Sequence, residues 1–276
     1  WYIREIEQPA GFVLDDTVYP VSIGKDAQVV EIKIVNKYIR GNIHLTKVDA
    51  EYPDNKLTGA TFEVYKDSNG SGKLDDSDEL LGTLTEKEIG EYGMNDLFYG
   101  RYFVKETKAP EGFVLDTGVY EVMIDTDGKT YEVENKAGIG FINDAMRGNL
   151  KIIKTSSDGK VKGFAFRITG ANGYDIILET NDKGEIFIDG LRIGDYTIFE
   201  VSNSASSMYV LPADKKATVK LGSTTIVEMH NVLRDTPKTG DTTNLPLLYA
   251  LAGLSAVGIA VCGVIGFKKK KKEDRN

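Results

Sequence analysis

The chain has 276 residues, a formal net charge of −8 and a single cysteine, Cys262. This length suits about two domains of ordinary size. We expect neither nucleic acid nor an anionic membrane surface as a partner, because an acidic chain would be repelled by both. With one cysteine, the chain can form no internal disulfide and no cysteine-based zinc site.

Several segments of the chain recur. The matching copies are Trp1–Asp15 with Tyr102–Asp116, Asn36–Lys47 with Asn143–Lys154, and a third, shorter start at Asn231–Asp235. These repeats predict the C-terminal part of a domain over residues 1–40 and whole domains over 41–148 and 149–234. Because the chain opens inside a repeat, we expect further sequence before Trp1, including a signal peptide.

Short runs of alternating apolar and polar residues fill both whole domains, as in Ala60–Tyr65 and Glu185–Asp189. Glycine, asparagine and aspartate separate these runs, which is typical of β-strands and turns. No amphipathic helix is evident before the C-terminal region. The pattern predicts an all-β chain with one immunoglobulin-like β-sandwich per domain.

Side chains two apart on a strand share one face and so form a row. Several of the apolar rows in this chain end in a polar residue. These residues are Lys47, Glu106 and Asn143 in the first whole domain and Lys154, Glu200 and Asn231 in the second. Burying an unpaired lysine or glutamate is costly, so their recurrence on inward rows suggests a function. The alternative is that they are solvated strand ends that recur because the domain was duplicated.

Lysine, glutamate and asparagine can form a covalent bond when they are buried together. Burial lowers the pKa of lysine and raises the pKa of glutamate. A neutral lysine amine can attack the asparagine carbonyl carbon while a protonated glutamate polarises that carbonyl, and ammonia leaves. The product would be a Lys–Asn isopeptide bond, which could replace the disulfides that this chain lacks.

Three motifs, Lys47-Val-Asp49, Gly59-Ala-Thr-Phe62 and Glu106-Thr-Lys-Ala-Pro-Glu-Gly-Phe113, resemble those of Cna B-type and SpaA-like domains. The resemblance covers nearly all of residues 1–235 and implies a prealbumin-like fold. The assignments that it implies are a Lys47–Asn143 bond assisted by Glu106, a Lys154–Asn231 bond assisted by Glu200, and a Glu5–Asn36 pair whose lysine would precede Trp1. The second whole domain departs from the family pattern after Glu200.

An acidic insert in the first whole domain matches the twelve-residue calcium loop of EF-hands. Its oxygen-ligand positions hold Asp67, Asn69, Ser71, Lys73 through its carbonyl, Asp75 and Asp78. The last position is aspartate instead of the usual glutamate, and flanking helices are not evident. A solvated acidic loop is the alternative. Calcium is thus the one cofactor that the sequence suggests, and the isopeptide chemistry requires none.

The C-terminal region, residues 235–276, combines a short motif, an apolar run over 245–267 and a basic tail over 268–276. The motif residues are Thr236, Pro237, Lys238, Thr239 and Gly240. The apolar run is long enough to cross a bilayer as one transmembrane helix, with the lysines on the cytoplasmic side. This order resembles the LPxTG sorting signal of Gram-positive surface proteins, with threonine in place of the usual leucine. The alternative is an ordinary membrane anchor.

The resemblance implies that a sortase cleaves after Thr239 and joins it to peptidoglycan or to a pilus subunit. We therefore predict a structural stalk anchored in the cell wall, not an enzyme, that carries an adhesive head before Trp1. Such a head would bind a host matrix protein. Two alternatives are a pilus subunit polymerised by a pilin sortase, and the stalk of a surface enzyme whose catalytic domain lies upstream.

Overall fold

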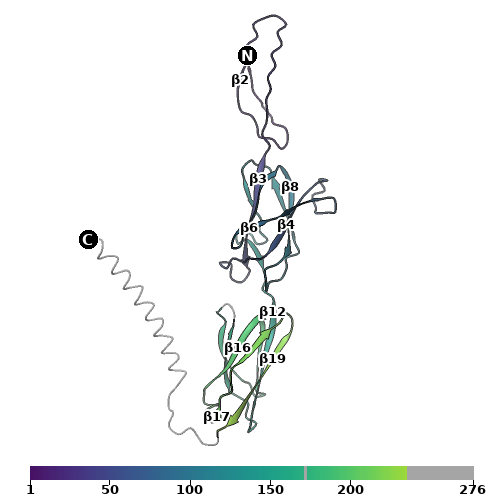
Figure 1. Ribbon diagram of the computed structural model, residues 1–276. Helices are drawn as coiled ribbons and strands as arrows, with labels where there is room; N and C mark the ends of the chain where they lie inside the picture. Colours follow the sequence, from purple (N-terminus) through teal and green to yellow (C-terminus); the bar gives the residue numbers. More distant parts are fainter. Residues whose placement is uncertain (171–172, 235–276) are drawn as a thin grey trace, which may run out of the picture. The chain divides into compact units, whose positions relative to one another are not determined.

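The computed structural model describes residues 1–170 and 173–234, whose regular structure consists of β-strands apart from a 3₁₀ position at Gly173. The chain divides into two compact units, the first spanning Trp1–Met146 and the second beginning at Arg147 (Figure 1). The predicted all-β fold is confirmed for this part of the chain. The division falls close to the expected junction after residue 148, and residues 1–40 group with the first unit.

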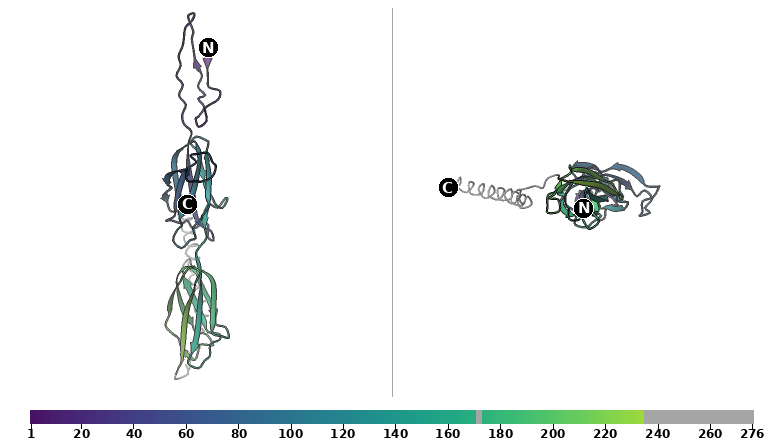
Figure 2. Two further views of the ribbon diagram at one scale, coloured as in Figure 1. Left: turned by 90° about the vertical axis from the view of Figure 1, so that its right-hand side faces the viewer. Right: turned by 90° about the horizontal axis from the view of Figure 1, so that it is seen from below.

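From residue 40 on, the first unit contains two sheets that form the layers of a sandwich (Figures 1 and 2). Its strands are β3 (Arg40–Asp49), β4 (Thr61–Lys66), β5 (Glu79–Thr83), β6 (Thr85–Glu88), β7 (Glu91–Phe98), β8 (Gly100–Lys108), β9 (Val119–Ile124), β10 (Thr130–Glu132) and β11 (Phe141–Asn143). One sheet has the order β10-β3-β7-β6, with β11 also paired to β3, and the other has the order β5-β4-β8-β9.

The second unit repeats this plan with two four-stranded sheets. Its strands are β12 (Arg147–Ser156), β13 (Ala165–Gly170), β14 (Asp175–Glu179), β15 (Glu185–Arg192), β16 (Gly194–Val201), β17 (Tyr209–Val210), β18 (Lys215–Val219) and β19 (Thr224–Leu233). The sheet orders are β15-β12-β19-β17 and β14-β13-β16-β18. In each sandwich the first strand, β3 or β12, is the parallel neighbour of the last strand, β11 or β19.

Each unit has its own apolar core between its two sheets. The core of the first unit draws on Ile43 and Leu45 from β3 and on Phe62, Val64 and Val104 from the facing sheet. The second core is built from the corresponding strands. Because strand side chains alternate between faces, the inward row of each strand continues directly into its polar end.

The Arg-Gly sequence that opens both whole domains lies in a crowded β-bulge. The pairing of the first strand with its antiparallel neighbour shifts register after Gly41 and again after Gly148. A Cβ atom at Gly148 would lie 2.1 Å from the carbonyl oxygen of Lys220, and one at Gly41 would lie 3.0 Å from that of Lys129. Only glycine lets the backbones approach this closely.

Residues 1–40 form a smaller element with two short antiparallel strands, β1 (Tyr2–Ile3) and β2 (Tyr19–Pro20). Trp1 is 82% exposed, whereas its counterpart in the first sandwich, Tyr102, is 1% exposed. The position that is buried in the first sandwich is thus open to solvent at the start of this segment.

The sorting motif 236–240, the apolar run 245–267 and the basic tail lie outside the described residues. Among residues 1–170 and 173–234, no helix is long and apolar enough to cross a membrane.

Candidate isopeptide-forming sites

The first and last strands of each sandwich bring a lysine and an asparagine onto the same face of one sheet. Lys47 on β3 lies opposite Phe141 on β11, two residues before Asn143. The second unit repeats this register with Lys154 on β12 and Asn231 on β19. Since the strands are parallel neighbours, the same two-residue offset places the lysine and the asparagine next to each other in both units.

A glutamate reaches the same place from the facing sheet. In the first unit, Asn143 Nδ2 donates a 2.7 Å hydrogen bond to Oε2 of Glu106 on β8. In the second, Asn231 Nδ2 donates a 2.7 Å hydrogen bond to Oε1 of Glu200 on β16. All six lysine, glutamate and asparagine side chains are buried. The structure thus brings together the three residue types that the sequence pattern grouped.

Burial opposes the positive charge of Lys47, which is completely enclosed. Desolvation lowers its pKa from 10.5 to about 8, against the attraction of nearby carboxyl groups, of which Glu106 acts most strongly. The Nζ atom donates to the backbone carbonyl oxygens of Phe141 at 3.1 Å and Val48 at 3.2 Å. These bonds hold the amine against the strand that carries the asparagine.

Burial also opposes the negative charge of Glu106. Desolvation raises its pKa above the ordinary value, although hydrogen bonds from Asn143 and from the backbone N–H of Asp116, and the charge of Lys47, act in the opposite direction. The lysine is therefore shifted toward its neutral amine and the glutamate toward its neutral acid.

The second site has the same chemistry with different neighbours. Burial lowers the pKa of Lys154 against the attraction of Glu200 and Asp158, and burial raises the pKa of Glu200. Lys154 Nζ donates to the carbonyl oxygen of Thr155 and lies 4.2 Å from the ring centroid of Phe164.

Two buried oxygens in each site receive no hydrogen bond from the described residues. They are Glu106 Oε1 and Asn143 Oδ1 in the first unit, and Glu200 Oε2 and Asn231 Oδ1 in the second. Leaving such atoms without a donor is costly inside a protein. Each pair belongs to a glutamate and an asparagine that are already joined through the other oxygen and the amide nitrogen.

Asp116, which was not predicted from the sequence, adjoins the first site. Its backbone N–H donates to Glu106 Oε2 at 2.8 Å. Its carboxylate accepts hydrogen bonds from the backbone N–H of Gly118 at 2.6 Å, the Tyr120 hydroxyl at 2.8 Å and Asn135 Nδ2 at 2.6 Å. Although burial acts against it, these donors hold the pKa of Asp116 below its ordinary value.

The first 40 residues reproduce part of this arrangement. Asn36 Nδ2 donates to Glu5 Oε1 at 2.6 Å, the backbone N–H of Asp15 donates to Glu5 Oε2 at 2.7 Å, and the Tyr19 hydroxyl donates to Asp15. The sequence pattern that could have revealed this aspartate is the same in both copies. The aspartate follows the glutamate by ten residues, and a tyrosine follows the aspartate by four. No lysine of the described residues completes this first pair.

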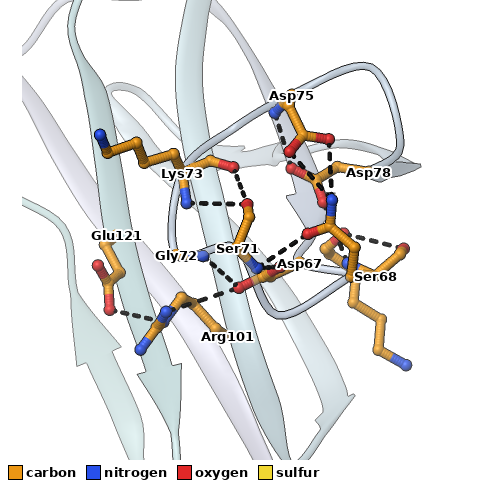
Figure 3. Close-up of polar contacts among 11 residues, drawn as sticks. Asp67, Ser68, Ser71, Gly72, Lys73, Asp75, Asp78, Arg101 and Glu121 are labelled. Carbon is orange, nitrogen blue, oxygen red and sulfur yellow. Dashed lines mark hydrogen bonds and ion pairs between the residues drawn. The ribbon is translucent and has the colours of Figure 1, made fainter.

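The acidic insert forms a closed loop whose polar groups bond to one another (Figure 3). Asp67 accepts the backbone N–H groups of Ser71 and Gly72, both at 3.1 Å, and Asp78 accepts that of Asp75 at 2.9 Å. Arg101 Nη1 lies 3.6 Å from Asp67 Oδ2. Several carboxylate oxygen atoms that would bind calcium thus accept backbone N–H groups or lie near an arginine.

Two further expected ligands lie in the same loop. Asn69 turns its Nδ2 atom toward Asp75 at 3.0 Å, and Ser71 Oγ donates to the carbonyl oxygen of Lys73 at 2.8 Å. In the part of the chain that the structure describes, no three His, Cys, Asp or Glu side chains are gathered closely enough to hold a metal ion. Calcium binding by this loop stays a prediction.

Comparison with known proteins gives a family match over most of the chain. A family model described as the SpaA prealbumin-like fold domain matches residues 41–137 and 148–232. The trypsin-resistant surface T6 protein of Streptococcus pyogenes serotype M6 is 28% identical over 194 residues, which cover 69% of this chain and 32% of that protein. The chain therefore spans about a third of the length of this relative.

Two solved structures are similar to this chain. The Bacillus anthracis TIE protein superposes with a TM-score of 0.65 at 24% identity, covering 84% of this chain and 41% of that one. A streptococcal ancillary pilin matches with a TM-score of 0.32 at 21% identity, covering 85% of this chain and 75% of that one. The likeness to the TIE protein supports the prealbumin-like fold and says nothing further about activity.

Proposed function

Because the chain belongs to the SpaA family of prealbumin-like fold domains, we propose that it is a structural protein of the Gram-positive cell surface. Its two sandwich units are each closed by an intramolecular isopeptide bond, Lys47–Asn143 in the first and Lys154–Asn231 in the second. A buried glutamate assists each reaction. The chain acts once upon itself and turns over no external substrate.

The observation that carries this proposal is the pair of buried oxygens without a donor in each site. A proton on Glu106 Oε1 supplies the donor that both this oxygen and Asn143 Oδ1 lack. With the bond from Nδ2 to Oε2, it completes the two-point pairing of a carboxylic acid with a primary amide. The raised pKa of Glu106 favours this protonated form.

The reaction turns an amine and a primary amide into a secondary amide and ammonia, with no other reactant. Lys47 Nζ attacks Asn143 Cγ while Glu106 gives its proton to Oδ1, and Glu106 then takes a proton from Nζ. When the Cγ–Nδ2 bond breaks, Glu106 passes that proton to the departing ammonia. The Oδ1 proton returns to Glu106 as the carbonyl reforms, so the acid ends as it began.

The position of the bond gives it a mechanical role. It joins the first strand of each sandwich to the last strand, and these two strands are parallel neighbours. A pulling force that enters the first unit along β3 crosses from Lys47 to Asn143 and leaves through the end of the unit. Residues 48–142 then carry no tension. The sandwich can therefore transmit force without unfolding.

The bond also stabilises each unit against unfolding. Treated as a cross-link that closes a loop of nearly the whole domain, it contributes about 4–5 kcal/mol by restricting the unfolded chain. The T6 relative is described as trypsin-resistant. A covalently closed sandwich, which opens rarely, explains such resistance physically, and we propose the same property for this chain.

Mass spectrometry of the intact purified chain tests the proposal. Two bonds remove two molecules of ammonia, or about 34 Da, from the mass that the sequence predicts. Proteolysis should then release one branched peptide that contains Lys47 and Asn143 and another that contains Lys154 and Asn231. An unchanged mass, with all four residues recovered in linear peptides, rules out the bonds.

Attachment to the wall is the second part of the proposal, and it rests on the C-terminal signal in the sequence. Sortase joins Thr239 to peptidoglycan, so Thr239→Ala should shift the protein from the muramidase-released fraction to the membrane fraction of a Gram-positive host. Ladders of covalent multimers on a denaturing gel would instead identify a pilus subunit. Retention of the Thr239→Ala variant in the wall would contradict sortase anchoring.

A further inference from the structure

Glu106 is held in place by a neighbour that takes no part in the bond itself. The backbone N–H of Asp116 donates to Glu106 Oε2 at 2.8 Å, and the same oxygen accepts Asn143 Nδ2 at 2.7 Å. An oxygen that accepts two N–H groups acts as the carbonyl oxygen of a neutral acid. The N–H of Asp116 therefore leaves Oε1 to carry the proton.

Three donors keep the Asp116 side chain ionised. They are the backbone N–H of Gly118, the Tyr120 hydroxyl and Asn135 Nδ2. Burial, followed by the hydrogen bond to Asp116, raises the pKa of Tyr120 to about 12, so its hydroxyl remains a donor at any pH relevant here. Asn135 also accepts the backbone N–H of Ile142 at 2.6 Å, which ties this network to the strand of Asn143.

The charge of Asp116 acts on both ionisable groups of the reaction. The pKa of Glu106, which burial raises, is raised further by Asp116, and the pKa of Lys47, which burial lowers, is partly restored by Glu106, Asp116 and Asp49. The titratable groups that face Asp116 are Lys47, Glu106 and Tyr120. A fixed negative charge here moves the titrations of the lysine and the glutamate to higher pH together.

Building on the function proposed above, we propose that Asp116 is a positioning residue for the Lys47–Asn143 bond. It orients the acid of Glu106 through its backbone N–H and sets the pH window of the reaction through its fixed charge.

Of the other two copies of the repeat, one shares this arrangement and the other lacks it, and both bear on the proposed role. Residues 1–40 repeat the bond from Asp15 N–H to Glu5, with Tyr19 on the Asp15 carboxylate. The second unit is built differently, because among the described residues the Glu200 carboxyl accepts the Asn231 amide but no backbone N–H. Its aspartate beside the lysine, Asp158, acts on Lys154 without contacting Glu200. The second site is therefore an internal control for the first.

The test compares the parent chain with Asp116→Asn, which removes the charge and keeps the backbone N–H. Each full chain is recovered unfolded from inclusion bodies, freed of molecules that are already cross-linked, and refolded by dilution into buffers from about pH 5 to about pH 10. Aliquots are quenched in acid, and the two branched peptides are counted separately by mass spectrometry. Glu111→Gln, an exposed charge removal in the same unit, is the matched control.

The rate of the Lys47–Asn143 bond should rise as the lysine loses its proton and fall as the glutamate loses its own, with apparent pKa values that belong to the coupled pair. In Asp116→Asn both the rising and the falling limb of this pH–rate profile should move to lower pH by about half a unit or more. Such a shift is about a threefold change in rate on either limb. The Lys154–Asn231 bond should keep its profile in the same molecules, and Glu111→Gln should match the parent.

Limbs that do not move in Asp116→Asn overturn this inference while leaving the proposed function intact. A parent chain that forms neither bond overturns both. If Asp116→Asn fails to fold, as judged by circular dichroism, Asp116→Ser decides, because it also removes the charge, keeps the backbone N–H and retains an oxygen that can accept a hydrogen bond. It should move both limbs in the same direction, and unmoved limbs in Asp116→Ser would then overturn the inference.

Discussion

Replacing Glu106 by glutamine separates the fold of the first site from its chemistry. Glutamine has nearly the same shape, and its Oε1 can accept the N–H groups of Asn143 and Asp116 that Glu106 Oε2 accepts now. Its Nε2 can donate to Asn143 Oδ1, which lacks a donor. The amide has no proton to transfer at neutral pH, so Glu106→Gln should fold and leave Lys47 unbonded.

Two magnitudes follow from the structure. The Glu106→Gln chain should lose one molecule of ammonia instead of two, a difference of about 17 Da after allowing for the substitution itself. The first unit should also lose the stabilisation of the cross-link, about 4–5 kcal/mol for a loop that spans nearly the whole domain. For a domain of this size, that loss lowers the melting temperature of the unit by about 20–35 °C.

Intact-mass measurement and differential scanning calorimetry of the full chain read out both effects. Glu200→Gln is the reciprocal variant, which should lose the Lys154–Asn231 bond and keep Lys47–Asn143. Glu111→Gln, on the exposed surface of the first unit, should keep both bonds and the melting profile of the parent.

A Glu106→Gln chain that still loses two molecules of ammonia would show that the carboxyl group is not needed. The expected loss of stability would be contradicted by a chain that keeps the calorimetric profile of the parent after the first bond is lost. In that case the bond would not be a source of stability.

Three further predictions test other parts of the structure. Asn143→Ala leaves Lys47 as a free buried amine with a pKa of about 8 instead of 10.5. Between these two pH values the unfolded chain keeps a proton on Lys47 that the folded chain has lost. In denaturant titrations the free energy of unfolding, relative to that of the bonded parent, should therefore rise by up to about 3 kcal/mol from pH 8 to pH 10.5. If the acidic loop binds calcium, calorimetry should show a binding heat that Asp67→Ala abolishes and Asp76→Ala retains, and a parent chain without such a heat removes the site from consideration. Gly148→Ala forces a Cβ atom against a carbonyl oxygen 2.1 Å away and should destabilise the second unit by at least about 1–3 kcal/mol in thermal unfolding, whereas an unchanged melting temperature would contradict the tight bulge.

The all-β architecture and the buried lysine, glutamate and asparagine residues could be predicted from the sequence. Alternation with a period of two is a local property, so it shows which side chains of a strand share a face without any knowledge of the strand's neighbours. The repeats then showed that Lys47, Glu106 and Asn143 recur as Lys154, Glu200 and Asn231, each on an inward row.

The acidic loop shows where local pattern fails. The spacing of Asp67, Asn69 and Asp75 fits a calcium loop, but spacing does not say which atoms point inward. In the structure Asn69 presents its amide nitrogen to Asp75, and Asp67 is occupied by backbone N–H groups and by Arg101. These orientations depend on how the loop closes upon itself and on a strand distant in sequence.

The residue types of each site, their burial and the repeat that relates them could be inferred before any fold was known, because they follow from local periodicity and from comparison of the chain with itself. Three features emerged only from the folded chain: the lysine and asparagine strands are parallel neighbours, one glutamate oxygen accepts the amide while the other lacks a donor, and Asp116 holds Glu106. These features arise from pairings between strands far apart in the chain, and the register of such pairings is set by the packing of the whole sandwich.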